Sequence, residues 1–321
     1  MKKLIKYIIR FLMNIVGKDL LSSPEVFVTY HHRPKKSDTI GAYESESYPN
    51  VGIVMQGPLK QENDFTFETI KLYKKYYPAT PIIVSIWDTE LTEDIERLRQ
   101  LCDQNKVCIS HFEKNNSINY QRITSLAGVR KAHELGCQYI LKTRTDQRIY
   151  MPQVLSFLIK LHTDFPVNIE SKAHGRIITC GMSTFSNRLY NISDMFVFGM
   201  SEDILRYYSC PLDSRDHSKL VKPDSKCYCN YRQYCADYSK LRTGEIWFTS
   251  HYIESLGFQL KWTHEDSDYF RRELFIIVDD SMLDFYWPKY TDKEYRWRNY
   301  KTIDSLHQVT FMEWYKEQQI H

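Results

Sequence analysis

Residues 119–150 read NYQRITSLAGVRKAHELGCQYILKTRTDQRIY, and this stretch decides the fold. Its first half places apolar residues at helical spacing from Arg122 to Leu135, and Gly136 follows where a helix usually ends. A short apolar run, residues 139–141, comes next and is typical of a strand that is buried on both faces. The stretch therefore predicts a helix that is followed directly by a buried strand.

Charged side chains follow this predicted strand. Lys142, Arg144, Asp146 and Arg148 alternate with polar residues. In open α/β sheets ligands bind beyond the carboxyl ends of the strands. Lys and Arg at such an edge suit a pyrophosphate, and a single Asp suits a divalent cation that bridges it. The alternative interpretation is that Asp146 only forms ion pairs with Arg144 and Arg148 on an exposed loop.

Strands and helices alternate through the first half of the chain. Before the deciding stretch, apolar runs predict strands at residues 51–55, 81–87 and 107–112, and helical patterns lie at 66–76 and 91–101. Such alternation favours a parallel, doubly wound sheet. After it, we expect a helix at 152–161 and strands at 176–180 and 195–198.

The composition fits one large domain with embellishments. The chain has 321 residues, of which 42% are hydrophobic, enough to bury a large core. A net charge of +3 is too small to favour a nucleic-acid partner. Aromatic residues make up 14% of the chain, which suits stacking on sugars or nucleobases as well as ordinary packing.

The eight cysteines do not match a metal or disulfide framework. Cys227 and Cys229 lack the two-residue gap of a zinc knuckle, and no second matching pair follows. No signal-peptide cleavage site is present either. We therefore expect reduced thiols and a cytoplasmic protein.

The two ends of the chain differ from its middle. Residues 1–19 combine an apolar helical face with five basic residues, and they are too short and too charged to span a bilayer, which needs about 20 apolar residues. We expect an amphipathic helix that lies on the inner face of the cytoplasmic membrane, the alternative being a helix packed on the domain. Residues 20–49 suggest a linker, residues 50–290 the main domain, and residues 291–321 a helical tail.

Four blocks of sequence resemble the WavE family of lipopolysaccharide-biosynthesis proteins. They are VGIVMQGPL at 51–59, the block that ends in RTDQRIY at 150, ISDMFVFG at 192–199 and DFYWPKY at 284–290. The resemblance implies an α/β fold of the GT-A (nucleotide-diphospho-sugar transferase) type, which is a Rossmann-like mixed sheet flanked by helices, in a single domain with an insertion. It also implies a glycosyltransferase of lipopolysaccharide or capsule synthesis, with a nucleotide-diphospho-sugar donor and a glycan or lipid-linked saccharide acceptor.

The resemblance also implies site residues. In enzymes of this type the end of the first strand contacts the nucleoside, which points to Gln56 and Gly57. The match to the family places Asp194 near the donor sugar, whereas a lone Asp before a strand is otherwise a turn residue.

Two further residues are candidates for nucleotide contacts. Asp88 follows the second strand, where such folds often hold the ribose or the base, and it is equally suited to cap the next helix. Arg122 lies near the start of the helix in the deciding stretch, so it is a candidate for a phosphate or uracil contact, with simple surface exposure as the alternative.

Glycosyl transfer with inversion needs a carboxylate that takes the proton of the acceptor hydroxyl. Glu245 is our first choice for this base, because it follows Gly244 in the first turn of a predicted helix. A first-turn Glu also simply stabilises a helix dipole. Asp194 is the second choice.

The leaving diphosphate must be neutralised, either by a metal or by Arg and Lys. Where many such enzymes carry Asp-x-Asp, this chain has Arg144-Thr145-Asp146, so its metal dependence is open. If Mn²⁺ or Mg²⁺ binds, Asp146 and His264 are the candidate ligands. Otherwise Lys142, Arg144 and Arg148 share the neutralisation.

Two other functions fit parts of the sequence. A nucleotidyltransferase also binds nucleotides on an α/β sheet, but it usually has a Gly-rich phosphate loop with Lys or Arg after the first strand, and residues 55–59 are poor in both. The third interpretation is a non-catalytic scaffold for glycan assembly.

Overall fold

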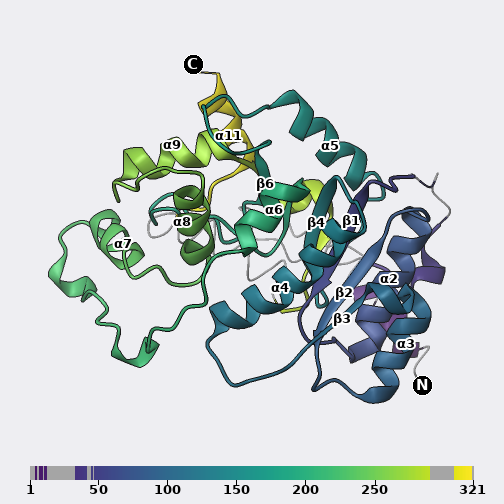
Figure 1. The fold of residues 1–321 in the computed structure, drawn as a ribbon. Coiled ribbons are helices and arrows are strands. Elements are labelled where there is room, and N and C mark those ends of the chain that lie inside the picture. Colours follow the sequence, from purple (N-terminus) through teal and green to yellow (C-terminus); the bar gives the residue numbers. More distant parts are fainter. Residues whose placement is uncertain are drawn as a thin grey trace. The chain divides into compact units, whose positions relative to one another are not determined.

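The computed structural model describes residues 4–5, 7–9, 11–12, 33–41, 45, 47–289 and 307–319 (Figure 1). The chain divides into two units, residues 1–40 and residues 41–321.

In the first unit, the described residues between Leu4 and Leu12 are helical and exposed. A short 3-10 turn, η1 (Ser37–Thr39), lies near the end of this unit. Residues 13–32, which include the end of the expected amphipathic helix and much of the expected linker, lie outside the described residues. None of the helices in the described ranges combines the length and the hydropathy needed to cross a membrane.

The second unit is built on a seven-stranded sheet with the order β3-β2-β1-β4-β7-β6-β8. Its strands are β1 (Val51–Gln56), β2 (Ile82–Trp87), β3 (Val107–Ser110), β4 (Tyr139–Arg144), β6 (Ile177–Cys180), β7 (Val197–Met200) and β8 (Phe275–Val278). Neighbouring strands are parallel except at β7, which is antiparallel to both β4 and β6. The expected Rossmann-like mixed sheet of the GT-A type is therefore confirmed.

Helices and short turns connect these strands. The helices are α2 (Phe65–Tyr76), α3 (Thr92–Cys102), α4 (Ser117–Glu134), α5 (Val154–Asp164), α6 (Ser201–Tyr208), α7 (Tyr231–Ser239), α8 (Glu245–Ser255), α9 (His264–Leu274) and α11 (Phe311–Gln318). The 3-10 turns are η2 (Glu62–Asp64), η3 (Gln104–Lys106), η4 (His217–Lys219), η5 (Ser225–Cys227) and η6 (Asp280–Leu283). A second small sheet pairs β5 (Arg148–Ile149) with β9 (Phe285–Tyr286).

The direction of winding reverses between β1 and β4. The chain builds the sheet outward from β1 through β2 to β3, and then crosses back to add β4 on the other side of β1. Because crossovers between parallel strands are right-handed, α2 and α3 lie on one face of the sheet and α4 on the other. The carboxyl ends of β1 and β4 therefore form a topological switch point, the usual place for a ligand in such sheets.

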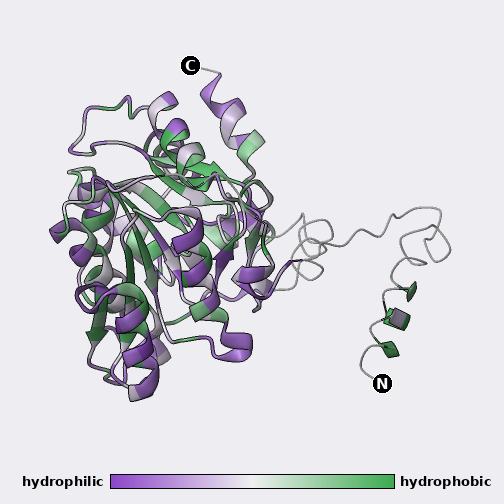
Figure 2. Ribbon diagram, turned by 90° about the vertical axis from the view of Figure 1, so that its right-hand side faces the viewer, coloured by the Kyte–Doolittle hydropathy of each residue, from purple (hydrophilic) through white to green (hydrophobic). Residues whose placement is uncertain are grey.

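Close packing of α4 on β1 fixes that switch point. A Cβ atom on Gly128 of α4 would lie 2.5 Å from Cγ1 of Val54, so only glycine allows the helix to approach the strand this closely. The strands are mostly hydrophobic, and hydrophilic residues gather on the helices and loops around them (Figure 2). All residues of β1 and β2 are buried.

The structure extends one predicted strand. We expected the strand to end at Leu141, but β4 continues to Arg144 because Lys142, Thr143 and Arg144 pair in register with Val54, Met55 and Gln56. The two cations thus belong to the sheet itself. In the expected C-terminal tail, α11 is a helix, and residues 290–306 lie outside the described part.

Candidate active site

Backbone contacts tie the end of β1 to β4 and to β2. The Thr145 N–H donates to the Gln56 carbonyl over 3.1 Å, and the Gly57 N–H donates to the Ser85 carbonyl over 3.0 Å. Gly57 has φ +111°, a conformation that favours glycine. Gln56 accepts a hydrogen bond from Thr124 Oγ1 over 2.8 Å, while its Nε2 is buried without a partner among the described residues. This edge therefore keeps one polar donor, the Gln56 side-chain amide, unused among the described residues.

Arg144, Asp146 and Trp287 form a compact polar group beside this edge. Arg144 donates from Nε and Nη2 to the two oxygens of Asp146, over 2.8 and 3.3 Å. Trp287 Nε1 donates to Asp146 Oδ2 over 2.9 Å, and the Arg144 guanidinium lies 5.3 Å from the Trp287 ring centre. Both charged side chains are about one fifth exposed, 19% for Arg144 and 22% for Asp146. Asp146 therefore orients a cation that remains accessible from solvent.

Lys142 lies deeper, on the same face of β4. Its side chain is 1% exposed, and Nζ donates to the Asp194 carbonyl oxygen over 2.6 Å. Asp194 Oδ2 lies 3.8 Å from the same Nζ. Burial lowers the pKa of Lys142 to about 8, although the charge of Asp194 opposes this shift. Both carboxylate oxygens of Asp194 are buried and accept no hydrogen bond from the described residues.

Glu245 is the second carboxyl group of this site. It is the first residue of α8, follows Gly244, and is partly buried. Burial and then the negative charge of Asp194 raise the pKa of Glu245 to about 7, with Arg188 acting in the opposite direction. The two residues that we had ranked as candidate bases therefore lie within electrostatic reach of each other. A carboxyl group that titrates near neutral pH is suited to general acid–base chemistry.

Two tyrosines of α6, Tyr207 and Tyr208, are buried in this part of the site. Tyr208 donates from its hydroxyl to the Asp194 carbonyl over 3.1 Å, and its ring centre lies 5.3 Å from Lys142 Nζ. Tyr207 packs against α8, with its hydroxyl 3.4 Å from Thr249 Oγ1. Both tyrosines are completely buried, which keeps water away from Asp194.

The structure corrects our expectation for Arg148. Its side chain is 1% exposed and points away from the mouth of the sheet into α2. It donates to Thr69 Oγ1 over 2.8 Å and to the Phe65 carbonyl over 2.9 Å, and it lies 4.4 Å from the Phe65 ring centre. Arg148 therefore supports the fold. Lys142 needs the same correction, because full burial against Asp194 excludes it from a solvent-open phosphate site.

Asp88 and Arg122 each join separate elements of the second unit. Asp88 bonds His111 Nδ1 over 2.6 Å and accepts from the Phe112 N–H over 2.9 Å, which joins the ends of β2 and β3. It is not the N-cap of α3, which is Leu91. Arg122 is half-buried and donates from Nε to the Cys210 carbonyl over 2.9 Å, so it fastens α4 to the segment after α6.

The two expected metal ligands have different neighbours. Both oxygens of Asp146 already accept hydrogen bonds from Arg144 or Trp287. His264 begins α9, where burial and then the charge of Arg232 lower its pKa. Within the described ranges, no three His, Cys, Asp or Glu side chains gather as a metal site requires. The pair Asp146 and His264 therefore does not fit a metal ion.

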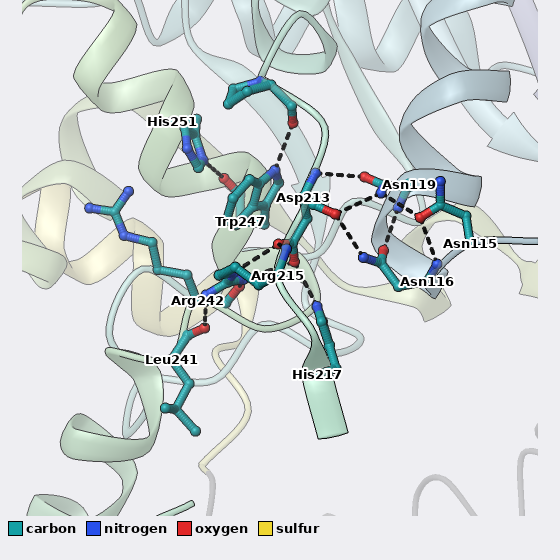
Figure 3. Close-up of polar contacts among 11 residues, drawn as sticks. Asn115, Asn116, Asn119, Asp213, Arg215, His217, Leu241, Arg242, Trp247 and His251 are labelled. Atoms are coloured by element: carbon teal, nitrogen blue, oxygen red, sulfur yellow. Dashed lines mark hydrogen bonds and ion pairs between the residues drawn. The ribbon is translucent and has the colours of Figure 1, made fainter. Parts of the chain in front are cut away.

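A polar network that the sequence analysis missed holds the insertion to the start of α4 (Figure 3). Asp213 accepts from Arg215 Nε over 2.8 Å and bonds His217 Nε2 over 2.6 Å. Burial opposes the ionisation of Asp213, but Arg215 and His217 outweigh it and lower the pKa to about 2. On the other side, Asn119 bonds both the N–H and the carbonyl of Asp213 over 2.8 and 2.9 Å.

This network lines a hollow of about 480 Å³. The lining residues are Asn115, Asn116, Asn119, Leu212, Asp213, Ser214, Arg215, Asp216 and His217. The three asparagines within five residues were the only signal in the sequence, and Asn116 is the N-cap of α4. Their partner lies 94 residues further along the chain, at Asp213, and no local pattern indicates it.

The fold and the site define a class of protein. A Rossmann-like α/β sheet of the GT-A type carries Arg144 at its topological switch point, and Lys142 of the same strand pairs with buried Asp194. The sequence profile of the WavE lipopolysaccharide synthesis family matches residues 51–273. This chain belongs to that family and takes part in lipopolysaccharide synthesis, as the resemblance had indicated. No curated protein matches the sequence significantly.

Proposed function

We propose that this protein is a glycosyltransferase that moves a sugar from a nucleotide-diphospho-sugar to a saccharide acceptor in lipopolysaccharide synthesis. One observation carries the proposal: Glu245 has a pKa raised to about 7 by burial and by the charge of Asp194, and Asp194 Oδ2 itself lies 3.8 Å from Lys142 Nζ. A carboxylate that accepts a proton near neutral pH is what an attacking sugar hydroxyl requires.

In this reaction Glu245 takes the proton of the acceptor hydroxyl. The hydroxyl oxygen forms a bond to the anomeric carbon of the donor sugar, and the bond from that carbon to the diphosphate oxygen breaks. The bonding electrons leave with the nucleoside diphosphate. The proton remains on Glu245 until it is lost to solvent, and Lys142 Nζ, 3.8 Å from Asp194 Oδ2, supplies positive charge beside the neighbouring carboxyl group.

Negative charge that develops on the diphosphate needs a cation. Arg144 meets this need in the proposal, because Asp146 and Trp287 orient it at the carboxyl end of β4 and it is still partly exposed. Gln56 and Gly57 lie beside it at the end of β1, where the nucleoside would bind, and the buried Nε2 of Gln56 is an available donor. In the proposal Asp88, which follows β2, binds the ribose.

The donor set argues for cationic neutralisation over a metal held by Asp146. Activity is therefore expected to survive dialysis against a chelator and to fall in Arg144→Ala. A loss of activity on chelation that Mn²⁺ or Mg²⁺ restores would contradict this assignment and return Asp146 to the role of a ligand.

The reaction products distinguish the proposed function from its rivals. The protein is incubated with UDP-, GDP- and CDP-sugars, and the released phosphates are separated by ion-exchange chromatography. A glycosyltransferase releases nucleoside diphosphate, a nucleotidyltransferase releases or consumes pyrophosphate, and a scaffold releases neither. Binding of each nucleotide sugar by calorimetry gives a second readout, since the scaffold should bind none.

We also propose that the N-terminal segment holds the protein on the inner face of the cytoplasmic membrane. Its described residues expose large apolar side chains, for example Ile8 (46% exposed) and Ile9 (50%). The basic residues of the same segment suit anionic lipids. Ile8→Asp/Ile9→Asp should abolish co-sedimentation with phosphatidylglycerol vesicles, whereas Met312→Asp, at an exposed position of α11, should not. Equal sedimentation of both variants would contradict the anchor.

A further inference from the structure

One threonine closes the loop that carries Asp194 from β6 to β7. Thr184 is completely buried, and its Oγ1 donates to the Cys180 carbonyl at the end of β6 over 2.9 Å. The same Oγ1 accepts a hydrogen bond from the Ser193 N–H over 3.1 Å. Ser193 is the residue directly before Asp194. A single hydroxyl therefore joins the two ends of this loop next to the buried carboxyl group.

Backbone contacts hold Ser193 and Asp194 on both sides of the peptide bond between them. Thr179 Oγ1 of β6 donates to the Ser193 carbonyl. The Asp194 carbonyl accepts from Lys142 Nζ over 2.6 Å and from the Tyr208 hydroxyl over 3.1 Å. Apart from the ion pair with Lys142, the carboxylate oxygens of Asp194 have no partner among the described residues. The position of this carboxyl group therefore depends mainly on how its backbone is held.

The C-terminal segment binds the same threonine. We call residues 307–319 the C-terminal strap. The Val309 N–H of the strap donates to the Thr184 carbonyl over 3.0 Å. A Cβ atom on Gly181, at the start of the loop, would lie 2.5 Å from the Val309 carbonyl oxygen, so a side chain at this position would push the strap away. Thr184 thus contacts the strap through its carbonyl and the Asp194 backbone through its hydroxyl.

The helix of the strap is bound to the body of the unit. Trp314 of α11 is completely buried, and its Nε1 donates to the Phe275 carbonyl of β8 over 2.8 Å. Arg271 of α9, the helix beside α11 (Figure 1), donates to Glu317 Oε1 over 2.9 Å. The strap lies beyond residue 273, where the match to the family ends. A part of the chain outside the matched region is therefore connected to the candidate site.

We propose that Thr184 is a positioning residue for sugar transfer: it connects the C-terminal strap to the backbone of Asp194 and so fixes the carboxyl group of Asp194 in the site. This inference rests on the proposed function. Buried hydrogen bonds suit this task, because breaking one leaves a donor and an acceptor unpaired away from water. A displacement of about 1 Å in a reacting group can lower a rate about 100-fold. Thr184 itself touches no reacting atom and acts through Asp194.

The position of Asp194 has an observable consequence at Glu245. Burial is the larger cause of the raised pKa of Glu245, and the negative charge of Asp194 is the next. If Asp194 moves away, the pKa of Glu245 should therefore fall. The other charged or titratable groups that act on the two carboxyl groups are Lys142 of β4, Tyr207 and Tyr208 of α6, and Arg188 of the loop. Burial raises the pKa of both tyrosines, so they stay neutral near pH 7.

The experiment compares the full chain with four variants. Thr184→Val removes the hydroxyl and keeps the shape of the side chain, and Thr184→Ser keeps the hydroxyl. Thr80→Val is the matched control, because Thr80 is also buried and donates to the Tyr48 carbonyl over 3.0 Å before the amino end of β2, at the opposite edge of the sheet. Val309→Pro removes the strap N–H that binds Thr184, and it tests the same connection if Thr184→Val does not fold.

The first readout is the titration of the Glu245 carboxyl group, which needs no substrate. It is followed by carbon NMR of protein labelled in its glutamates, and Glu245→Gln identifies the signal. The pKa of Glu245 should fall by about half a pH unit or more in Thr184→Val and in Val309→Pro. It should change by less than about 0.2 in Thr184→Ser and in Thr80→Val.

The second readout is the rate of transfer. Thr184→Val should lower kcat about 10- to 100-fold while the KM for the nucleotide sugar stays within about twofold, and Thr184→Ser should restore most of the rate. An unchanged Glu245 titration in folded Thr184→Val overturns the inference, whatever the rate. Equal changes in Thr184→Val and Thr80→Val also overturn it, because the effect is then general destabilisation. Failure of the proposed function appears differently, as no nucleoside diphosphate from any donor in any variant, while the titration still reports the position of Asp194.

Discussion

Lys142 Nζ lies 3.8 Å from Asp194 Oδ2, and both side chains are only 1% exposed. A buried carboxylate is costly without a counter-ion, and this cation provides one. Burial and then the negative charge of Asp194 raise the pKa of Glu245 to about 7, so Glu245 is the carboxyl group that takes up a proton near neutral pH. Lys142 therefore acts as a positioning residue for the carboxyl group of Asp194.

Replacing this counter-ion should move the pH dependence of the reaction. In Lys142→Met the site loses one positive charge, which favours the protonated form of Glu245. The pH at which kcat/KM reaches half its maximum should therefore rise, by roughly one unit or more. The change leaves the buried carboxyl group of Asp194 without its cation, which typically costs about 3 to 5 kcal/mol of stability, so thermal unfolding of the variant is measured alongside to show that it is folded at the assay temperature. The measurement is kcat/KM from pH 5.5 to 9, and a midpoint equal to that of the unchanged protein would show that Lys142 has only a packing role.

The stability of the protein should fall as the pH rises through 7, to the extent that Glu245 contributes. Its pKa is higher in the folded chain than in the unfolded chain, so folding favours the protonated form. This contribution is fully present below the pKa of an unfolded Glu and is lost as the pH passes about 7. Glu245→Gln should therefore flatten the dependence of Tm on pH between 4.5 and 8. An unchanged slope in the variant would mean that Glu245 titrates at its ordinary pKa.

Arg144 and Arg148 should respond in opposite ways to the same change. Arg148→Gln leaves the Thr69 hydroxyl and the Phe65 carbonyl without their buried donor, so the free energy of unfolding should drop by about 2 to 5 kcal/mol. Arg144→Gln alters a partly exposed group and should cost at most about 1 kcal/mol, but it should weaken binding of the nucleotide sugar at least about tenfold. Denaturant unfolding and calorimetric titration of both variants provide the test. If both variants lost the same affinity for the nucleotide sugar, measured per folded molecule, Arg148 would belong to the binding site.

The sequence predicted the order of strands and helices because hydrophobic periodicity is a local property. From that order the carboxyl ends of β1 and β4 could be predicted to lie on one edge of the sheet. Glu245 lies in the first turn of α8, as expected. How deeply a charged side chain is buried in the fold is not a local property of the sequence. Lys142 is buried because Asp194 and Tyr208, 52 and 66 residues further on, close over it. Arg148 turns into α2 because β5 pairs with β9, a strand 137 residues away that no pattern near Arg148 indicates.

The same limit applies to the candidate metal ligands. Asp146 and His264 were joined only by their chemical type, and the sequence contains no information on the side chains that reach them first. In the fold Asp146 is occupied by Arg144 and Trp287, and His264 lies beside Arg232.

The most direct test of the role of Glu245 is the rate of sugar transfer in Glu245→Gln. It is compared with the rate of the unchanged protein, with the nucleotide sugar that the unchanged protein uses as donor. Loss of a general base should lower kcat about 10²- to 10⁴-fold, while the dissociation constant of the nucleotide sugar stays within about twofold. Full activity in Glu245→Gln, or a donor affinity lost together with the rate, would contradict the assignment of Glu245 as the base.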